Sequence, residues 1–428
     1  MKKLRLTTSF AVGWMLVTYL VSGAVRTVCY TVLAKFGVSS LYILATNVVI
    51  YAPLFCMLFV DSRLRRKAIR FFVLYLGIAL FFLITLAIHP NYLECYTRDI
   101  FGAIDAVFRP DTGALFGFLA VYLCKDFKQL RKFLLYAAYL TLLYSLYQLL
   151  MARRMGYWES YSYTGDTEHL NYNMDFGYSM IFCCIVFFDS FLSNRKHWYD
   201  LILTVLCFVL VLTEGSRGPM VCFVAYIVLY CLLRIKNMSL PKKLLIVALM
   251  IAAYVILANT WTDILSWIIK LLSGMNINSR TIDMLLNDTL MSDNGRNRIA
   301  ELAWGVIDQQ GFFGNGAYGS RWAIAPSYYW GYPHNIFLEF IIDYGWMLGC
   351  ILLGALVFAI LRTLFNADDE TLCVLCVLLS MNAKLLLSDS YWAYQFFWAL
   401  LGCMALVGSG VGRRFIKRKR SVLQRIVR

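Results

Sequence analysis

Long apolar blocks dominate the pattern of this chain. Residues 201–213, 219–233 and 243–260 are examples with few or no charges. A helix needs about 20 apolar residues to cross the hydrocarbon core of a bilayer, and the chain lacks the short alternating segments of a membrane β-barrel. The pattern predicts an all-α, polytopic transmembrane helical bundle of about 12 spans. The spans are expected near residues 9–25, 38–60, 70–88, 104–124, 133–151, 173–192, 199–213, 219–236, 243–260, 335–361, 371–389 and 391–411.

The connectors between these blocks alternate in charge. One set, which includes the N-terminus and the tail 413–428, carries 27 of the 40 Lys and Arg residues. Because Lys and Arg accumulate in cytoplasmic loops, both termini are predicted to be cytoplasmic. The net charge of +15 follows from this asymmetry and suits contact with anionic membrane lipids, so no nucleic-acid partner is expected. Two places depart from this topology: residues 153–154 oppose the rule, and residues 89–112 are too polar for a regular span. One of the spans near these places is therefore expected to be broken or re-entrant.

Composition leaves little room for a soluble domain. Hydrophobic residues make up 61% of the chain and charged residues 15%, whereas soluble domains carry about a quarter charged residues. We therefore treat residues 1–428 as a single integral membrane domain. Most of the 13 cysteines lie inside apolar blocks, where they act as small hydrophobic residues. Cys373 and Cys376 form a lone CxxC without a second pair, so no metal site and no cofactor are expected.

One connector, residues 261–333, is far longer than the others. Its 73 residues are predicted to form a large extracytoplasmic loop with short helices, and a loop of this length is usually functional. An apolar stripe at helical spacing predicts a helix that Asp293 or Asn294 caps and Gly311 ends. Eight aromatic residues within 312–332 fit either a membrane-interface belt or a ligand-facing surface. The stripe consists of Ile299, Leu302, Ala303, Val306 and Ile307.

Two arginine motifs on the predicted outer face suit anionic ligands. Ser216-Arg217-Gly218-Pro219 forms a turn before a span, with Pro219 placed as the first residue of a helix whose positive N-terminus points outward. Asn294 to Arg298 opens the loop helix with Arg296 and Arg298 in its first turn. Backbone donors beside guanidinium groups bind phosphate oxygens well. The alternatives are an arginine paired with Glu214 or a lipid headgroup, and a solvated first turn of the loop helix.

His334 stands where the large loop re-enters the membrane, in the segment Pro333-His334-Asn335. A histidine at a helix N-terminus can act as a neutral general base near pH 7, because the helix dipole disfavours the imidazolium. A nearby phosphate would act in the opposite direction. The alternative is an interfacial histidine that only caps the helix. The three other histidines lack such a setting, and no spacing of His, Asp or Glu indicates a bound metal.

The segment from Pro333 to Glu339, followed by Tyr344-Gly345, resembles the signature of the O-antigen ligase and O-antigen polymerase family of bacterial membrane glycosyltransferases. That family also has a Ser-Arg-Gly turn before a span, matched by residues 216–218. It has a Gly-Arg opening a loop helix and a later Gly-x-Gly, matched by residues 295–296 and 314–316. The resemblance covers residues 200–360. The chain departs from the pattern at Ala300, where the family often has Trp, and in the three residues between Gly345 and Gly349, where it usually has two.

The resemblance implies a donor substrate, a glycan linked to undecaprenyl diphosphate, at the outer face of the bacterial cytoplasmic (inner) membrane. It implies a metal-independent, inverting transfer of that glycan to an acceptor hydroxyl, in surface-polysaccharide synthesis such as O-antigen, lipopolysaccharide or capsule. We favour a polymerase. A ligase that transfers glycan to lipid A core or to protein is the alternative. The expected partners are the donor, a glycan or lipid acceptor, membrane lipids, a flippase and a chain-length regulator.

The resemblance also implies roles for single residues. Arg217 and Arg296 would bind the diphosphate and stabilise its charge as it leaves, and His334 would take the proton from the acceptor hydroxyl. Substrate contacts are expected from Ser216, Arg298, Arg321, Asn335 and Glu339.

Two readings from other classes and one from a related enzyme class stay open at this stage. A transporter or flippase would place ionisable groups at mid-membrane, where Asp189 and Lys384 give partial support, but no internal repeat is visible. A scaffold without chemistry leaves the 73-residue loop unexplained. A cell-wall glycan polymerase of the shape and division type would rely on a carboxylate, and the loop offers Asp283, Asp288 and Asp293.

Overall fold

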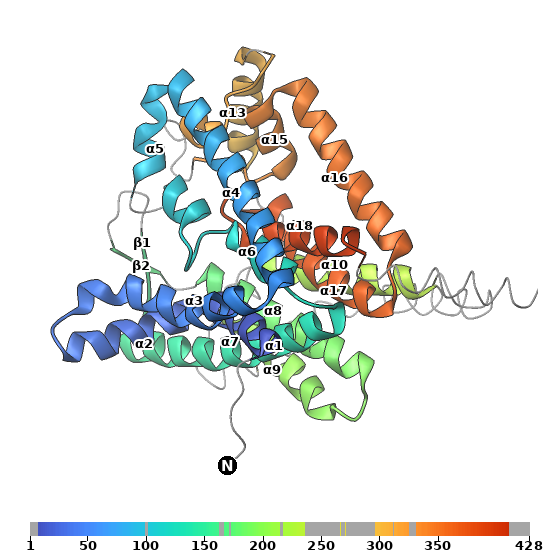
Figure 1. Ribbon diagram of the computed structural model, residues 1–428. Helices are drawn as coiled ribbons and strands as arrows, with labels where there is room; N and C mark the ends of the chain where they lie inside the picture. The colour runs from blue at the N-terminus through green and yellow to red at the C-terminus, as the bar shows by residue number, and fades with distance from the viewer. Residues whose placement is uncertain are drawn as a thin grey trace, which may run out of the picture. The chain divides into compact units, whose positions relative to one another are not determined.

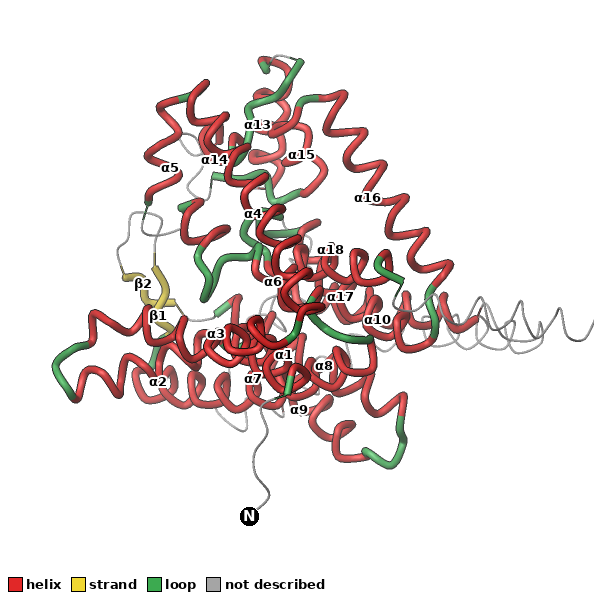
Figure 2. Tube along the Cα trace, in the orientation of Figure 1, coloured by secondary structure: helices red, strands yellow, loops and turns green. Residues whose placement is uncertain are grey.

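The computed structural model describes residues 7–98, 102–161, 167–170, 173–214, 217–235, 266, 270, 296–310, 312–324 and 331–410 (Figure 1). Within these residues the regular structure is helical except for one small two-stranded sheet, and loops and turns connect the elements (Figure 2), as the all-α prediction required. The helices of the first half are α1 (Thr8–Leu20), α2 (Ser22–Lys35), α3 (Tyr42–Val60), α4 (Ser62–Ile88), α5 (Leu93–Thr97), α6 (Phe116–Tyr122) and α7 (Phe127–Met155). The sheet pairs β1 (Trp158–Tyr161) with β2 (Thr167–Leu170). The remaining helices are α8 (Met174–Ser193), α9 (Trp198–Glu214), α10 (Arg217–Ile235), α13 (Arg296–Gln309), α14 (Gly319–Ile324), α15 (Ile336–Tyr344), α16 (Trp346–Asn366), α17 (Asp369–Asn382) and α18 (Gln395–Gly408).

The contacts group the chain into two compact units. The first consists of residues 1–144, 161–167 and 295–428, and the second of residues 145–160 and 168–294. The second unit packs α8 against α9 and α10, with Tyr226 donating to Asp189 at 3.0 Å. The single integral domain over residues 1–428 and the loop bounds 261–333 stay predictions.

Among the described residues, five helical segments are long and apolar enough to cross a membrane, or six when the bent pair α1–α2 counts as one span. Residues 243–260, predicted as another span, lie outside the described residues. The protein is thus a multi-pass helical membrane protein, while about 12 spans and cytoplasmic termini stay predictions. The five segments are Ser39–Val60, Ser62–Ile88, Phe127–Met155, Met174–Ser193 and Trp346–Asn366.

Several predicted spans differ from the observed helices. The expected span 9–25 ends at Leu20, where the chain bends by 84° into α2. The span 335–361 is divided at Gly345 into α15 and α16. Near the C-terminus, α17 stops at Asn382 and α18 starts at Gln395, because a polar segment interrupts what the sequence suggested were two nearly adjoining spans.

The polar stretch 104–124 is not one helix. It holds a single π-helical turn at Ile104–Phe108 and the seven-residue α6. Between them Asp111 is fully buried and accepts from Arg26 Nε at 2.6 Å and Arg109 Nε at 2.8 Å. The expected break in one of the spans therefore lies here. A buried carboxylate needs its two cationic partners, and the chain leaves the helical conformation where Asp111 meets them.

Candidate active site

His334 lies directly before α15, in the first unit. The side chain of Asn335 accepts from the backbone nitrogens of Phe337 at 2.9 Å and Leu338 at 3.4 Å, so Asn335 caps the helix. His334 itself has a φ of 52°, a strained conformation for a residue with a large side chain. Its ring centre lies 4.3 Å from that of Tyr332. The predicted placement of His334 at a helix N-terminus is therefore confirmed.

The Gly-x-Gly motif binds the opposite end of the same helix. The backbone nitrogens of Asn315 and Gly316 donate to the carbonyl oxygens of Ile342 and Asp343, both at 2.8 Å. These carbonyls belong to the last turn of α15 and would otherwise lack helical partners. Two motifs that stand 20 residues apart in the sequence therefore hold the two ends of one nine-residue helix.

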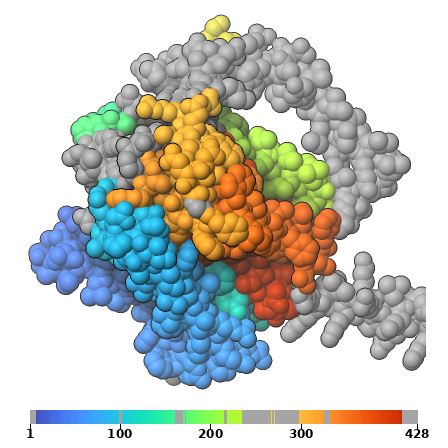
Figure 3. Space-filling model, turned by 90° about the horizontal axis from the view of Figure 1, so that it is seen from above, coloured from blue at the N-terminus to red at the C-terminus, as the bar shows by residue number. Residues whose placement is uncertain are grey.

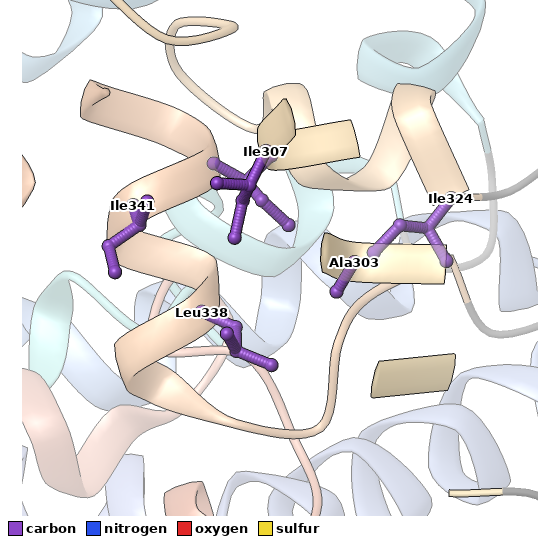
Figure 4. Packing of buried hydrophobic residues seen from close by; sticks show 6 residues of the cluster. Ala303, Ile307, Ile324, Leu338 and Ile341 are labelled. Carbon is purple, nitrogen blue, oxygen red and sulfur yellow. The ribbon is translucent and has the colours of Figure 1, made fainter. Parts of the chain in front are cut away.

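Helix α13 packs on α15 through the predicted apolar stripe (Figure 4). Ala303 and Ile307 are buried against Leu338 and Ile341, and the cluster also contains Ile342 of α15 and Ile324 of α14. The predicted loop helix is confirmed at Arg296–Gln309, and Arg296 is its first residue. The caps expected at Asp293, Asn294 and Gly311 lie outside the described residues.

Residues 312–324 are also tied to α4 and α5. Tyr96 donates to the carbonyl oxygen of Ala317 at 2.8 Å, and the nitrogen of Ala317 donates to Thr85 at 3.0 Å. The rings of Tyr92 and Trp322 lie 5.6 Å apart. Figure 3 shows the amber atoms of this region beside the light-blue atoms of α5. The loop next to His334 is thus fixed to the helical framework.

Glu339, in the first turn of α15, is 1% exposed. Ser390 donates its hydroxyl hydrogen to one carboxylate oxygen, and the backbone nitrogen of Tyr391 donates to the other at 3.2 Å. A buried carboxylate needs such donors to offset its loss of hydration. Glu339 therefore ties α15 to the segment between α17 and α18.

Asp343, one turn further along α15, also ties the helix to its neighbours, and it accepts more hydrogen bonds than Glu339 does. Its side chain accepts from Tyr391 Oη and Trp392 Nε1, both at 2.8 Å, and from the backbone nitrogen of Ser320 at 2.9 Å. The two carboxylates thus join α14, α15 and residues 390–392 into one hydrogen-bonded network.

Arg321 is buried between two tyrosine rings. Its guanidinium carbon lies 4.4 Å from the ring centre of Tyr332 and 5.2 Å from that of Tyr318, within the range of cation–π attraction. Burial raises the pKa of Tyr318 to about 12, against the opposing effect of Arg321, and burial likewise raises the pKa of Tyr332. Both rings therefore stay neutral around Arg321 at physiological pH. Asp389 adds negative charge nearby and pairs with Lys384 at 2.8 Å.

The described residues contain three non-glycine residues with positive φ, namely Tyr318, His334 and Asp389. All three belong to this region, which fits the tendency of backbone strain to gather at functional sites.

The predicted site residues fall into four groups. His334, Arg321, Asn335 and Glu339 gather around the N-terminal half of α15. Arg298 is exposed on α13. For Arg217 and Arg296 the structure describes the backbone but not the side chain, and each is the first residue of its helix. Pro219 was predicted as the first residue of the helix after the turn, but it is the third residue of α10. Ser216 lies outside the described residues.

The sequence did not point to Asp343, Ser390, Tyr391 and Trp392. Asp343 stands four residues after Glu339 in an otherwise apolar helix, a spacing that places both carboxyl groups on one face. Residues 388–392 interrupt two apolar runs with polar side chains. Those two signals together could have predicted the network.

Comparison with known families supports the resemblance. Residues 202–354 match the O-antigen ligase family model. The match spans α10, α13 and α15 and so includes the arginine turn, the Gly-Arg helix start, the Gly-x-Gly and the His-Asn segment. No curated protein and no solved structure matches the chain. The match supports a membrane glycosyltransferase of the O-antigen ligase and polymerase type, involved in polysaccharide synthesis.

Proposed function

We propose that this protein is a surface-polysaccharide polymerase that transfers a glycan from undecaprenyl diphosphate to a hydroxyl of another lipid-linked glycan. The observation that carries the proposal is the family match over residues 202–354, in which the arginine and histidine motifs stand in the family's order. The geometry around α15 supports it, because His334 is held in a strained position at a helix N-terminus.

In the proposed reaction, His334 takes the proton of the acceptor hydroxyl while the oxygen attacks the anomeric carbon of the donor glycan. The bond from that carbon to the diphosphate oxygen breaks, and undecaprenyl diphosphate leaves with the electron pair. The anomeric configuration inverts. Arg217 and Arg296 stabilise the charge of the leaving diphosphate, so the mechanism needs no metal ion.

The location follows from the same reasoning. The lipid-linked donor presents its diphosphate at headgroup depth, and the positive-inside pattern assigns the His334 end of α15 to the outer face of the bacterial cytoplasmic membrane. A fluorescent-protein fusion at the C-terminus is expected to fluoresce, whereas an alkaline phosphatase fusion at the same position is expected to be inactive. The reverse result would put the His334 end of α15 on the cytoplasmic face and exclude this proposal.

The test of the chemistry is the length of the glycan made by His334→Ala cells, with the membrane level of the protein measured in parallel. A polymerase with an essential His334 leaves a single repeat unit on the acceptor in place of a ladder. A ladder that persists on the lipid carrier but never reaches the final acceptor indicates a ligase. His197→Ala serves as the matched control, because His197 stands in the connector between α8 and α9, which contains none of the motifs. An unchanged ladder in His334→Ala at normal protein level would remove His334 from the mechanism.

A further inference from the structure

We propose that α13 and residues 312–313 rest in the headgroup region of the outer leaflet, held there by an aromatic anchor. The aromatic anchor consists of Trp304, Phe312, Phe313 and Trp346. Its partner is the phospholipid surface itself.

The depth of the anchor follows from α16. At 1.5 Å per residue its 21 residues extend about 32 Å, which matches a hydrocarbon core of about 30 Å. Among the described residues, only Gly349 and Thr363 of α16 are buried, so the rest of this apolar helix is available to face lipid. Trp346 is the first residue of α16 and therefore lies at the boundary between hydrocarbon and headgroups.

The other members of the anchor lie beside this boundary. The ring centre of Trp304 is 5.8 Å from that of Trp346. Residue 345 touches the 312–313 turn, since a Cβ on Gly345 would lie 2.1 Å from the carbonyl oxygen of Phe312. The rings of Phe312 and Phe313 contact each other edge to face at 5.3 Å.

These four side chains are exposed despite their size. Phe313 is 84% exposed and Phe312 60%, and both tryptophans are more than a third exposed. The opposite face of α13 is buried in the cluster with α15, so the exposed face is fixed rather than free to turn inward. A compact group of aromatic rings at the start of a membrane span suits the interface, where Trp gathers, better than it suits water.

The anchor has a consequence that rests on the proposed function. Arg296 is the first residue of α13, so lipid contact along this helix sets Arg296 at the depth at which a lipid-linked diphosphate presents its charge.

The experiment places a benzophenone amino acid at residue 304 or 313 and irradiates the protein in vesicles of phosphatidylethanolamine and phosphatidylglycerol with labelled acyl chains. Phe358, 66% exposed on α16, is the lipid-facing reference. Gln309 is exposed about 140° around α13 from Trp304, so it is the reference for the face of the helix turned away from the anchor. Labelling at 304 and 313 is expected within about threefold of Phe358 and at least about fivefold above Gln309. Labelling at 304 and 313 no higher than at Gln309 overturns the proposal.

A second arm separates lipid from glycan and from the proposed reaction. The vesicles in the first arm contain no glycan donor, so lipid labelling there does not depend on activity, and His334→Ala protein is expected to show it unchanged. Irradiation is then repeated with a lipid-linked glycan present. Continued attachment of phospholipid supports the anchor, whereas a shift of the label at residue 313 to glycan would show a sugar-binding surface instead and overturn it.

Discussion

A Cβ atom on Gly314 would lie 2.3 Å from the backbone nitrogen of Gly345, and both glycines have positive φ. The Gly-x-Gly loop and the break between α15 and α16 therefore meet backbone to backbone. This contact lets Asn315 and Gly316 reach the last carbonyls of α15. The position of the short helix that follows His334 thus depends on two residues without side chains.

Gly345→Ala is expected to lower both stability and transfer. Its φ of 78° strains an L-residue, and the new Cβ would lie 2.1 Å from the carbonyl oxygen of Phe312. Strain of this kind costs on the order of 1–3 kcal/mol, so the thermal unfolding midpoint in detergent should fall by several degrees. Gly354→Ala on α16 is the control, because nothing lies within 4 Å of the added atom. Equal midpoints for the two variants would contradict the proposed contact.

Glu339→Gln distinguishes a structural role of Glu339 in the hydrogen-bonded network from a role in substrate binding. A glutamine amide can donate to Ser390 and still accept from the Tyr391 nitrogen, so the free energy of unfolding of Glu339→Gln is expected to stay within about 1 kcal/mol of the parent. Glu339→Ala leaves the buried donors without an acceptor and is expected to lower the free energy of unfolding by about 2–5 kcal/mol. Thermal unfolding measures both changes. Loss of glycan transfer in a Glu339→Gln protein of normal stability would assign Glu339 a direct contact with substrate.

Arg321→Lys tests the tyrosine enclosure around the guanidinium. Lysine keeps the charge but lacks the planar group that lies 4.4 Å from the Tyr332 ring centre, two residues before His334. We expect about a tenfold fall in kcat with KM changed less than about threefold, because the substitution alters the placement of His334 rather than the binding of the donor. Kinetics in vesicles with purified lipid-linked glycan measure both values. A rise in KM alone would mean that Arg321 binds substrate directly.

Asp111→Ala is expected to prevent stable folding, whereas Asp105→Ala should be tolerated. Removing the buried Asp111 leaves Arg26 and Arg109 without the carboxylate between them, a loss of about 3–5 kcal/mol. Asp105 pairs with Arg109 at 3.0 Å but is about one-third exposed, so solvent screening limits its contribution to about 1 kcal/mol or less. The yield of monodisperse protein after detergent extraction compares the two. Similar yields would show that the Asp111 cluster is dispensable.

The sequence by itself determined the helical membrane class, because a bilayer admits backbone only when its hydrogen bonds are satisfied within the helix. It also determined the loop helix, whose apolar stripe needs a partner surface, and the helix start at Asn335, where a polar side chain precedes an apolar run. The family resemblance followed from motif order and is confirmed over residues 202–354.

Only the tertiary structure decided which of these segments contact one another. Local patterns do not report contacts between distant segments, so the pairing of Gly314 with Gly345 and of Asp343 with Trp392 was invisible in the chain. Arg321 shows the same limit: an arginine in an aromatic loop suggests a ligand contact, yet its guanidinium is enclosed by Tyr318 and Tyr332. Burial of a charge depends on which distant donors and rings converge on it, and only the folded arrangement supplies that information.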